Sequence, residues 1–214
     1  MRILLAFALL IGLTQCKNDR KIPENFDYGK VTNGVYQNAY FNFEMPVPNG
    51  WSVQNKQQVD QLKEMGRDMI GEKNKELAEQ VKAGEVRTAY LFTAFERPID
   101  SATGEFNPSI MIMAENIAGA NHVKDGSDYL RETKKAIERS NMGQEIDPTI
   151  HNVKVDGKPF GILETITPAG EGLKVHQEYY AHVQKGFAMT MILTYLTEAQ
   201  GEQLKKIVNT INFR

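Results

Sequence analysis

The sequence predicts an α+β fold in which an antiparallel β-sheet packs against three amphipathic helices. Two tight-turn pairs, Asp156-Gly157 and Lys185-Gly186, each separate two strand-like segments and so indicate β-hairpins. Three other segments carry apolar residues at helical spacing. Short strands in hairpins build antiparallel sheets, and the apolar face of such a sheet needs helices to cover it. A sandwich of sheet and helices within a single domain is therefore expected.

The first half of this domain is predicted to begin with one strand over 35–45, in which Val35, Phe41, Phe43 and Met45 fall on one face and Tyr36 and Tyr40 on the other. Pro46, Pro48 and Asn49-Gly50 then end the strand, and Trp51 follows as an apolar anchor. A long helix is expected over 54–83, with a possible break near Gly66 or Gly71. Strands over 86–95 and 109–115 should pair across a long loop.

The second half continues with a helix that starts at Ser127 as its N-cap and ends before Gly143. The hairpins 150–155 with 158–166 and 173–183 with 187–196 follow. The run Thr197-Glu198-Ala199-Gln200 matches a capping box, and an apolar stripe ending at Ile211 marks the last helix.

The N-terminus resembles a bacterial lipoprotein signal. Arg2 precedes the apolar stretch 3–13, which is too short to span a bilayer, and Leu13-Thr14-Gln15-Cys16 matches a lipobox. We expect residues 1–15 to be a cleaved signal peptide, Cys16 to carry the lipid, residues 16–30 to form a flexible tether and residues 31–214 to form the domain. An ordinary secretory signal or a membrane-anchoring helix is the alternative for the first part, and a tether packed through Phe26 and Tyr28 for the second.

Composition excludes several function classes. The chain of 214 residues has 25 Lys and Arg against 27 Asp and Glu, so no basic field suggests nucleic acid. Acylation of Cys16, the only cysteine, leaves no thiol for a disulfide, a metal or a nucleophile. The chain also lacks the short motifs of serine hydrolases, zinc proteases, phosphate-binding loops and dinucleotide-binding folds. We predict that the protein is not an enzyme and has no cofactor or metal.

The most suggestive polar set is a row on one predicted strand. Alternation places His176, Glu178, Tyr180 and His182 on one face. His176 and His182 are six residues apart, about 20 Å at about 3.3 Å per residue, which is too far to share one metal ion. A polar sheet face with cross-strand hydrogen bonds is the simpler interpretation.

The residues Phe41-Asn42-Phe43-Glu44-Met45-Pro46 and Pro48-Asn49-Gly50-Trp51 resemble the opening of PsbP-like domains, where F-x-F-x-x-P runs into P-x-G-W. The ending is similar too, with a last strand over 187–196 and a short helix that closes on Ile211-Asn212-Phe213. The long helix and the anchor make bacterial lipoproteins of the DcrB type the better likeness. The resemblance implies an α/β/α sandwich and an accessory or binding role, with no catalytic residues.

We therefore expect a lipid-anchored, non-enzymatic protein of the bacterial cell envelope, held in the outer membrane, with its periplasmic or surface orientation left open. It would bind an envelope protein through a sheet face or groove, and the residues proposed for that surface are Tyr36, Tyr40, Trp51, His176, Glu178, Tyr180 and His182. The alternative is a small-ligand carrier with a pocket between the sheet and the helix over 54–83. A hydrolase would need a buried carboxylate and a histidine that meet in a cleft.

Overall fold

The computed structural model describes residues 21–100, 105–140, 142–170 and 172–214. Cys16 and the predicted signal peptide lie outside the described residues. No helix in the described ranges is both long and apolar enough to cross a membrane.

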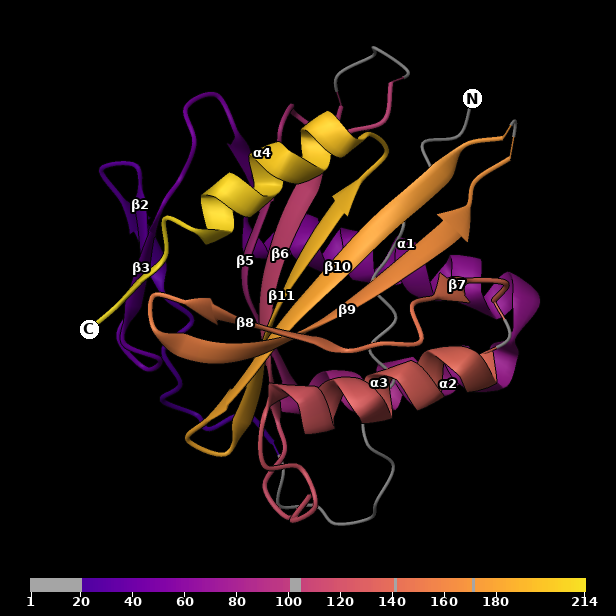
Figure 1. Ribbon diagram of the computed structural model, residues 1–214, viewed down its shortest axis with the longest axis horizontal. Helices are drawn as coiled ribbons and strands as arrows, with labels where there is room; N and C mark the ends of the chain where they lie inside the picture. Colours follow the sequence, from indigo (N-terminus) through magenta and orange to yellow (C-terminus); the bar gives the residue numbers. More distant parts are fainter. Residues whose placement is uncertain (1–20, 101–104, 141, 171) are drawn as a thin grey trace.

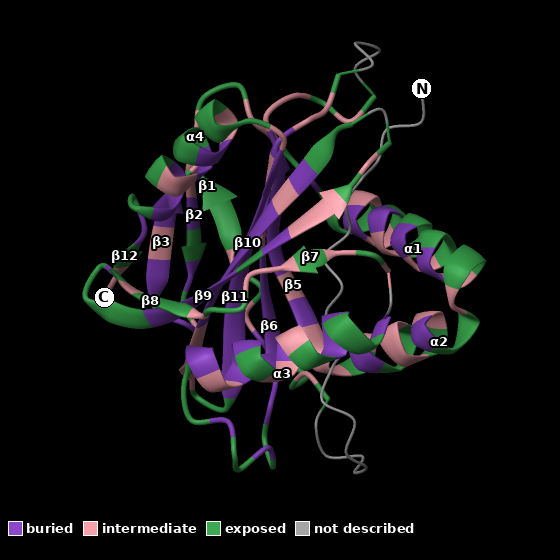
Figure 2. Ribbon diagram, turned by 45° about the vertical axis from the view of Figure 1, so that its right-hand side comes forward, coloured by how far each residue is buried: buried purple, intermediate pink, exposed green. Residues whose placement is uncertain are grey.

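An eight-stranded antiparallel sheet forms the centre of the fold (Figure 1), with strand order β4-β5-β6-β11-β10-β9-β7 and β8 also paired to β9. The paired segments are β4 (Ser52–Val53), β5 (Thr88–Phe95), β6 (Ser109–Asn116), β7 (Glu145–Ile146), β8 (His151–Val155), β9 (Lys158–Pro168), β10 (Lys174–Gln184) and β11 (Phe187–Tyr195). Both predicted hairpins are present, as β8 with β9 and β10 with β11. Every residue of β11 is buried, so the centre of the sheet is covered on both faces (Figure 2).

A second, four-stranded sheet has the order β1-β2-β3-β12. Its strands are β1 (Lys30–Thr32), β2 (Val35–Asn38), β3 (Phe43–Pro46) and β12 (Asn212–Phe213). Side chains from this sheet, such as Phe43 and Met45, join the same core cluster as Met189 and Met191 of β11. The small sheet therefore covers part of one face of the large sheet.

Four helices complete the α/β/α layering: α1 (Lys56–Lys73), α2 (Lys75–Gly84), α3 (Gly126–Ser140) and α4 (Glu198–Val208), together with a 3-10 turn at Glu85–Arg87. Leu204 of α4 packs in the core cluster that contains Tyr180, whereas Leu130 of α3 packs with Tyr179. Because Tyr179 and Tyr180 are consecutive in β10, their side chains point to opposite faces of the sheet. α4 and α3 thus cover opposite faces, as Figure 1 shows. The α+β class is confirmed, and the described residues form four helices where three were expected.

The strand predicted over 35–45 is wrong, because the segment is a hairpin. Asn42 has φ +57°, and the Asn38 side chain accepts a hydrogen bond from the Phe41 backbone (2.8 Å), which fixes the turn between β2 and β3. The turn resets the alternation, so that Tyr36 lies opposite Met45 and both face the core. This phase change is the physical reason that Tyr36 is buried.

The long helix predicted over 54–83 is two helices that meet at Asn74. Its side chain accepts a hydrogen bond from the Leu77 backbone (3.0 Å) and so acts as the N-cap of α2. The break lies beyond both predicted positions, Gly66 and Gly71. In α3, Asp125 makes the capping contact to the Asp128 backbone (2.8 Å), and Ser127 lies inside the helix.

The tether predicted over 16–30 does not extend to residue 30. Phe26 is buried against Phe187, and the Asp27 carboxylate accepts hydrogen bonds from the backbones of Gly29 (2.8 Å) and Ala39 (2.7 Å). Tyr28 stays half exposed. The chain from Ile22 onward therefore packs on the domain, which is the alternative interpretation given above.

Candidate functional site

The predicted polar row lies on β10, but its two central members are in the core. Glu178 is 1% exposed and Tyr180 is 7% exposed, whereas His176 and His182 are half-buried. His176 stacks on Tyr195, with ring centroids 5.3 Å apart. His182 packs between Phe160 and Phe213, and burial lowers its pKa against the opposing effect of its bond to the Pro159 carbonyl.

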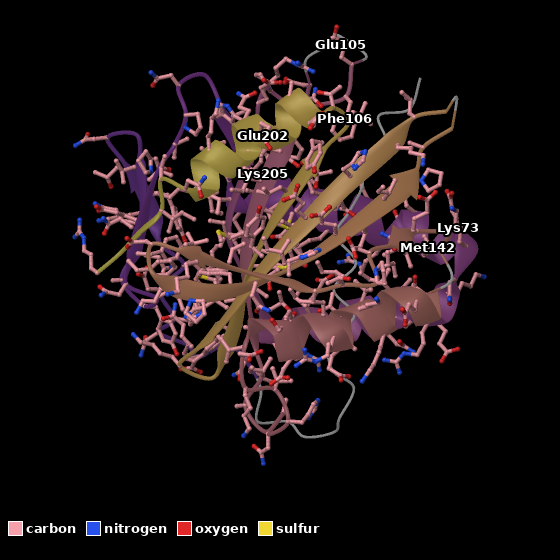
Figure 3. The ribbon with its side chains drawn as sticks, viewed as in Figure 1. Lys73, Glu105, Phe106, Met142, Glu202 and Lys205 are labelled. Atoms are coloured by element: carbon pink, nitrogen blue, oxygen red, sulfur yellow. The ribbon has the colours of Figure 1, made fainter. Side chains whose placement is uncertain are left out.

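Glu178 is the centre of a hydrogen-bond network that joins the sheet to α4. Its carboxylate accepts hydrogen bonds from the hydroxyls of Tyr195 (2.5 Å) and Tyr180 (2.9 Å), and Lys205 Nζ lies 3.1 Å from it. Lys205 extends from α4 (Figure 3). Burial, reinforced by the Glu178 charge, raises the pKa of both tyrosines, so they remain hydroxyl donors.

This network leaves Glu178 little capacity for chemistry. A hollow of about 240 Å³ beside it is lined by His176, Glu178, Tyr195, Glu164 and residues of β7. A histidine and a buried carboxylate therefore share a cleft, as a hydrolase would require. The carboxylate already accepts from two hydroxyls and an ammonium, however, and the His176 ring stacks on Tyr195. Within the part of the chain that the structure describes, no cluster of His, Cys, Asp or Glu could hold a metal ion.

A second buried carboxylate, which the sequence did not reveal, lies on the opposite face. Glu115 of β6 accepts hydrogen bonds from Arg87 Nε (2.9 Å) and from the Tyr129 hydroxyl of α3 (2.7 Å). Burial raises the pKa of Tyr129 and keeps it a donor. Both glutamates therefore tie a helix to the sheet.

The remaining members of the predicted surface lie elsewhere. Tyr36 is 2% exposed and donates to the Tyr28 carbonyl (2.8 Å), while Tyr40 and Trp51 are half-buried against the core cluster. Lys185 Nζ lies over the Tyr40 ring, 5.3 Å from its centroid. Tyr36, Glu178 and Tyr180 are buried, whereas the other four residues reach the surface in part. A role in binding for the seven residues stays a prediction.

A concave feature with buried polar residues in its lining lies between α1 and β5. This groove, of about 620 Å³, has the β5 residues Thr88, Tyr90, Leu91, Phe92 and Thr93 along one wall. The other lining residues are Tyr28, Gly29, Gln54, Lys56, Val59, Asp60, Lys63 and Glu85. Its volume falls within the range of about 300–1,000 Å³ that is typical of ligand pockets.

Two residues that line the groove each carry a buried side-chain oxygen with no hydrogen-bond partner, Gln54 Oε1 and Thr93 Oγ1. Gln54 is 7% exposed and Thr93 is 2% exposed. The Gln54 amide nitrogen is used, because it donates to the Ser52 carbonyl (2.7 Å). A buried polar atom without a partner costs about 1–3 kcal/mol, so a ligand that supplies the missing hydrogen bonds would recover this free energy.

The charged groups around the groove neutralise one another. Asp60 pairs with Lys56 (2.8 Å) and with Lys63 (3.0 Å), and Glu85 pairs with Lys63 (3.3 Å) and with Arg67. Lys63 also lies over the Tyr90 ring, 5.1 Å from its centroid. Burial raises the pKa of Tyr90, which stays a neutral phenol. The groove therefore presents no net field that would select a strongly charged ligand.

The sequence predicted a pocket beside the helix over 54–83, and the groove lies there. The sequence did not identify Gln54 or Thr93, because whether a side-chain oxygen finds a hydrogen-bond partner depends on the tertiary structure.

The fold of this chain is similar to that of PsbP-like proteins. Among solved structures, the chain is similar to the cyanobacterial PsbP from Synechocystis, with a TM-score of 0.51 and 13% identity over 84% of this chain and 91% of that chain. Weaker likenesses include LpqN of Mycobacterium tuberculosis, described as involved in cell envelope biogenesis (TM-score 0.40, 13% identity, 78% of each chain), and the protein PA94 of Pseudomonas aeruginosa (TM-score 0.42, 15% identity, 54% of this chain and 78% of that chain). No protein family and no curated protein matches the sequence.

Proposed function

We propose that this protein is a lipid-anchored, non-enzymatic binding protein of the bacterial cell envelope, and that the groove between α1 and β5 is its binding site. The observation that carries the proposal is the pair of buried, unpartnered oxygens, Gln54 Oε1 and Thr93 Oγ1, in the lining of that groove. By contrast, the buried carboxylates of Glu178 and Glu115 already accept hydrogen bonds from side chains of the protein itself.

The anchor rests on the lipobox that ends at Cys16. Two or more acyl chains hold a protein on a membrane firmly, because each buried CH₂ contributes about 0.8 kcal/mol. Metabolic labelling of an expressing bacterium with an alkyne fatty acid should label the wild-type protein in the membrane fraction. Cys16→Ser should abolish both the label and the membrane association. Equal labelling of the two proteins would contradict the proposed anchor.

The binding site can be tested with a library of neutral, polar small molecules. We would use the chain with Cys16→Ser and follow backbone amide shifts by nuclear magnetic resonance. Compounds that bind should change the amide chemical shifts of Gln54, Thr93 and the first turns of α1. Thr93→Val should lower the affinity of these compounds. Thr190→Val, a buried threonine of β11 outside the groove, is the matched control. Shifts that avoid the groove, or that are equal in both variants, would contradict this site.

A further inference from the structure

The outer edge of β5 is only partly covered by another strand. β4 pairs with two of its residues, Ser52 with Phe95 and Val53 with Ala94. The Gln54 backbone adds one further bond to the Thr93 carbonyl (2.8 Å), and the chain then turns into α1. From Thr88 to Phe92, no strand of the described residues lies along this edge.

This uncovered edge lies in the groove. Each residue from Thr88 to Thr93 except Ala89 lines it, and a register shift between Tyr90 and Phe92 marks a β-bulge at Leu91. An uncovered strand edge carries backbone N–H and C=O groups that can pair with another chain, and bulges are common at edges and near functional sites. The walls on either side are Val59 and Lys63 of α1 and the Tyr28-Gly29 segment.

We propose that the occupant of this groove is an extended peptide segment of a partner protein, which adds to the sheet as a strand beside β5. This inference rests on the proposed binding site and names the class of its ligand. A peptide backbone supplies what the groove lacks, since its N–H groups can donate to Gln54 Oε1 and Thr93 Oγ1 while its other amides bond the β5 edge. The mutual neutralisation of Lys56, Asp60, Lys63 and Glu85 fits a ligand recognised through its uncharged main chain.

The test begins with a random heptapeptide library displayed on phage and selected against the full-length chain with Cys16→Ser. A selected peptide is then synthesised in three forms: one unmodified, one with N-methyl groups on the odd-numbered backbone amides and one with N-methyl groups on the even-numbered amides. N-methylation removes donors but keeps the side chains. We expect at least a tenfold loss of affinity for one of the two N-methylation phases and a smaller loss for the other, because alternate amides of a strand point toward opposite neighbours.

Hydrogen exchange gives an independent readout. The unmodified peptide should slow exchange of backbone amides between Thr88 and Phe92, and Thr93→Val should weaken its binding while Thr190→Val should not. If peptides bind the groove but both methylated forms bind equally well, the strand-addition inference is overturned and the binding site stands. If no selected peptide contacts the groove while neutral small molecules do, the ligand class is wrong. If neither peptides nor small molecules bind the groove, both this inference and the proposed function fail. If β5 is protected only by dimerisation of the chain, this inference alone fails.

Discussion

Glu178 allows the sharpest test of how the sheet holds α4. It is 1% exposed and accepts hydrogen bonds from Tyr180 and Tyr195, with Lys205 Nζ at 3.1 Å. In Glu178→Leu the two hydroxyls lose their acceptor inside the core, and each buried unpaired donor costs about 1–3 kcal/mol. The Lys205 side chain is 37% exposed and can turn to solvent, so its share is below about 1 kcal/mol. We expect a total loss of about 3–5 kcal/mol in the free energy of unfolding.

Glu178→Gln is the matched control, because it keeps the shape and one carbonyl acceptor. It loses the charge that strengthens the three contacts, and we expect a cost of about 1–2 kcal/mol. Urea denaturation at pH 7, followed by circular dichroism, measures both variants. Equal costs for Glu178→Leu and Glu178→Gln would show that charge, not hydrogen bonding, dominates the site.

A double-mutant cycle separates the network from simple packing. Tyr195→Phe should cost about 1.5–3 kcal/mol in the wild-type protein, since the hydroxyl bonds a charged group. In the Glu178→Leu background that hydroxyl has already lost its acceptor, so the same substitution should cost close to nothing or stabilise the fold. If Tyr195→Phe costs the same in both backgrounds, the 2.5 Å contact does not contribute to stability and the reasoning is refuted.

Three further substitutions test other parts of the structure. Thr93→Val should raise the ligand-free free energy of unfolding by about 1 kcal/mol in a urea titration, because it removes a buried hydroxyl that has no partner; a loss of stability would show that the hydroxyl is bonded. Gly126→Ala should lower the melting temperature strongly, because the added Cβ would lie 1.8 Å from the Ala181 carbonyl oxygen and force α3 away from β10. Gly143→Asn, at an open site with φ +78°, is the control and should change the melting temperature little. Burial lowers the pKa of His182 in the folded protein, so as the pH falls the unfolded chain takes up this proton before the folded protein does. The contribution of His182 to stability should therefore be complete above about pH 6.5 and be lost as the pH drops toward the folded pKa. Thermal unfolding at several pH values should show that His182→Gln removes this part of the pH dependence.

The hairpins were predictable because their signals are local. Asp156-Gly157 and Lys185-Gly186 combine residues that adopt positive φ with strands on either side, and all four have positive φ in the structure. The capping box at Thr197 and Gln200 is equally local and is also present. Such elements depend on a few neighbouring residues and not on the rest of the fold.

The errors came from features in which distant residues decide. Alternation over 35–45 fitted one strand, but Asp27 binds the Ala39 backbone from twelve residues away and supports a turn there. The row on β10 was assigned to the correct face, yet its exposure depended on whether a helix covered it. α4 does so through Lys205, and alternation cannot distinguish a polar face in water from a polar network under a helix.

The two buried glutamates and the groove have a common explanation in how each helix is held. α4 is tied to the sheet by Glu178 and α3 by Glu115, in each case through tyrosine hydroxyls at 2.5–2.9 Å. α1 has no such tie to a buried glutamate among the described residues: it packs mainly against α2, and its polar contacts toward β5 include the Lys63–Glu85 ion pair, with side chains 16% and 19% exposed, and the Lys63–Tyr90 contact. An ion pair that still reaches solvent is screened more by salt than the fully buried networks of Glu178 and Glu115. α1 is therefore the helix that can adjust its distance from the sheet at the lowest cost in free energy, and it borders the uncovered edge of β5.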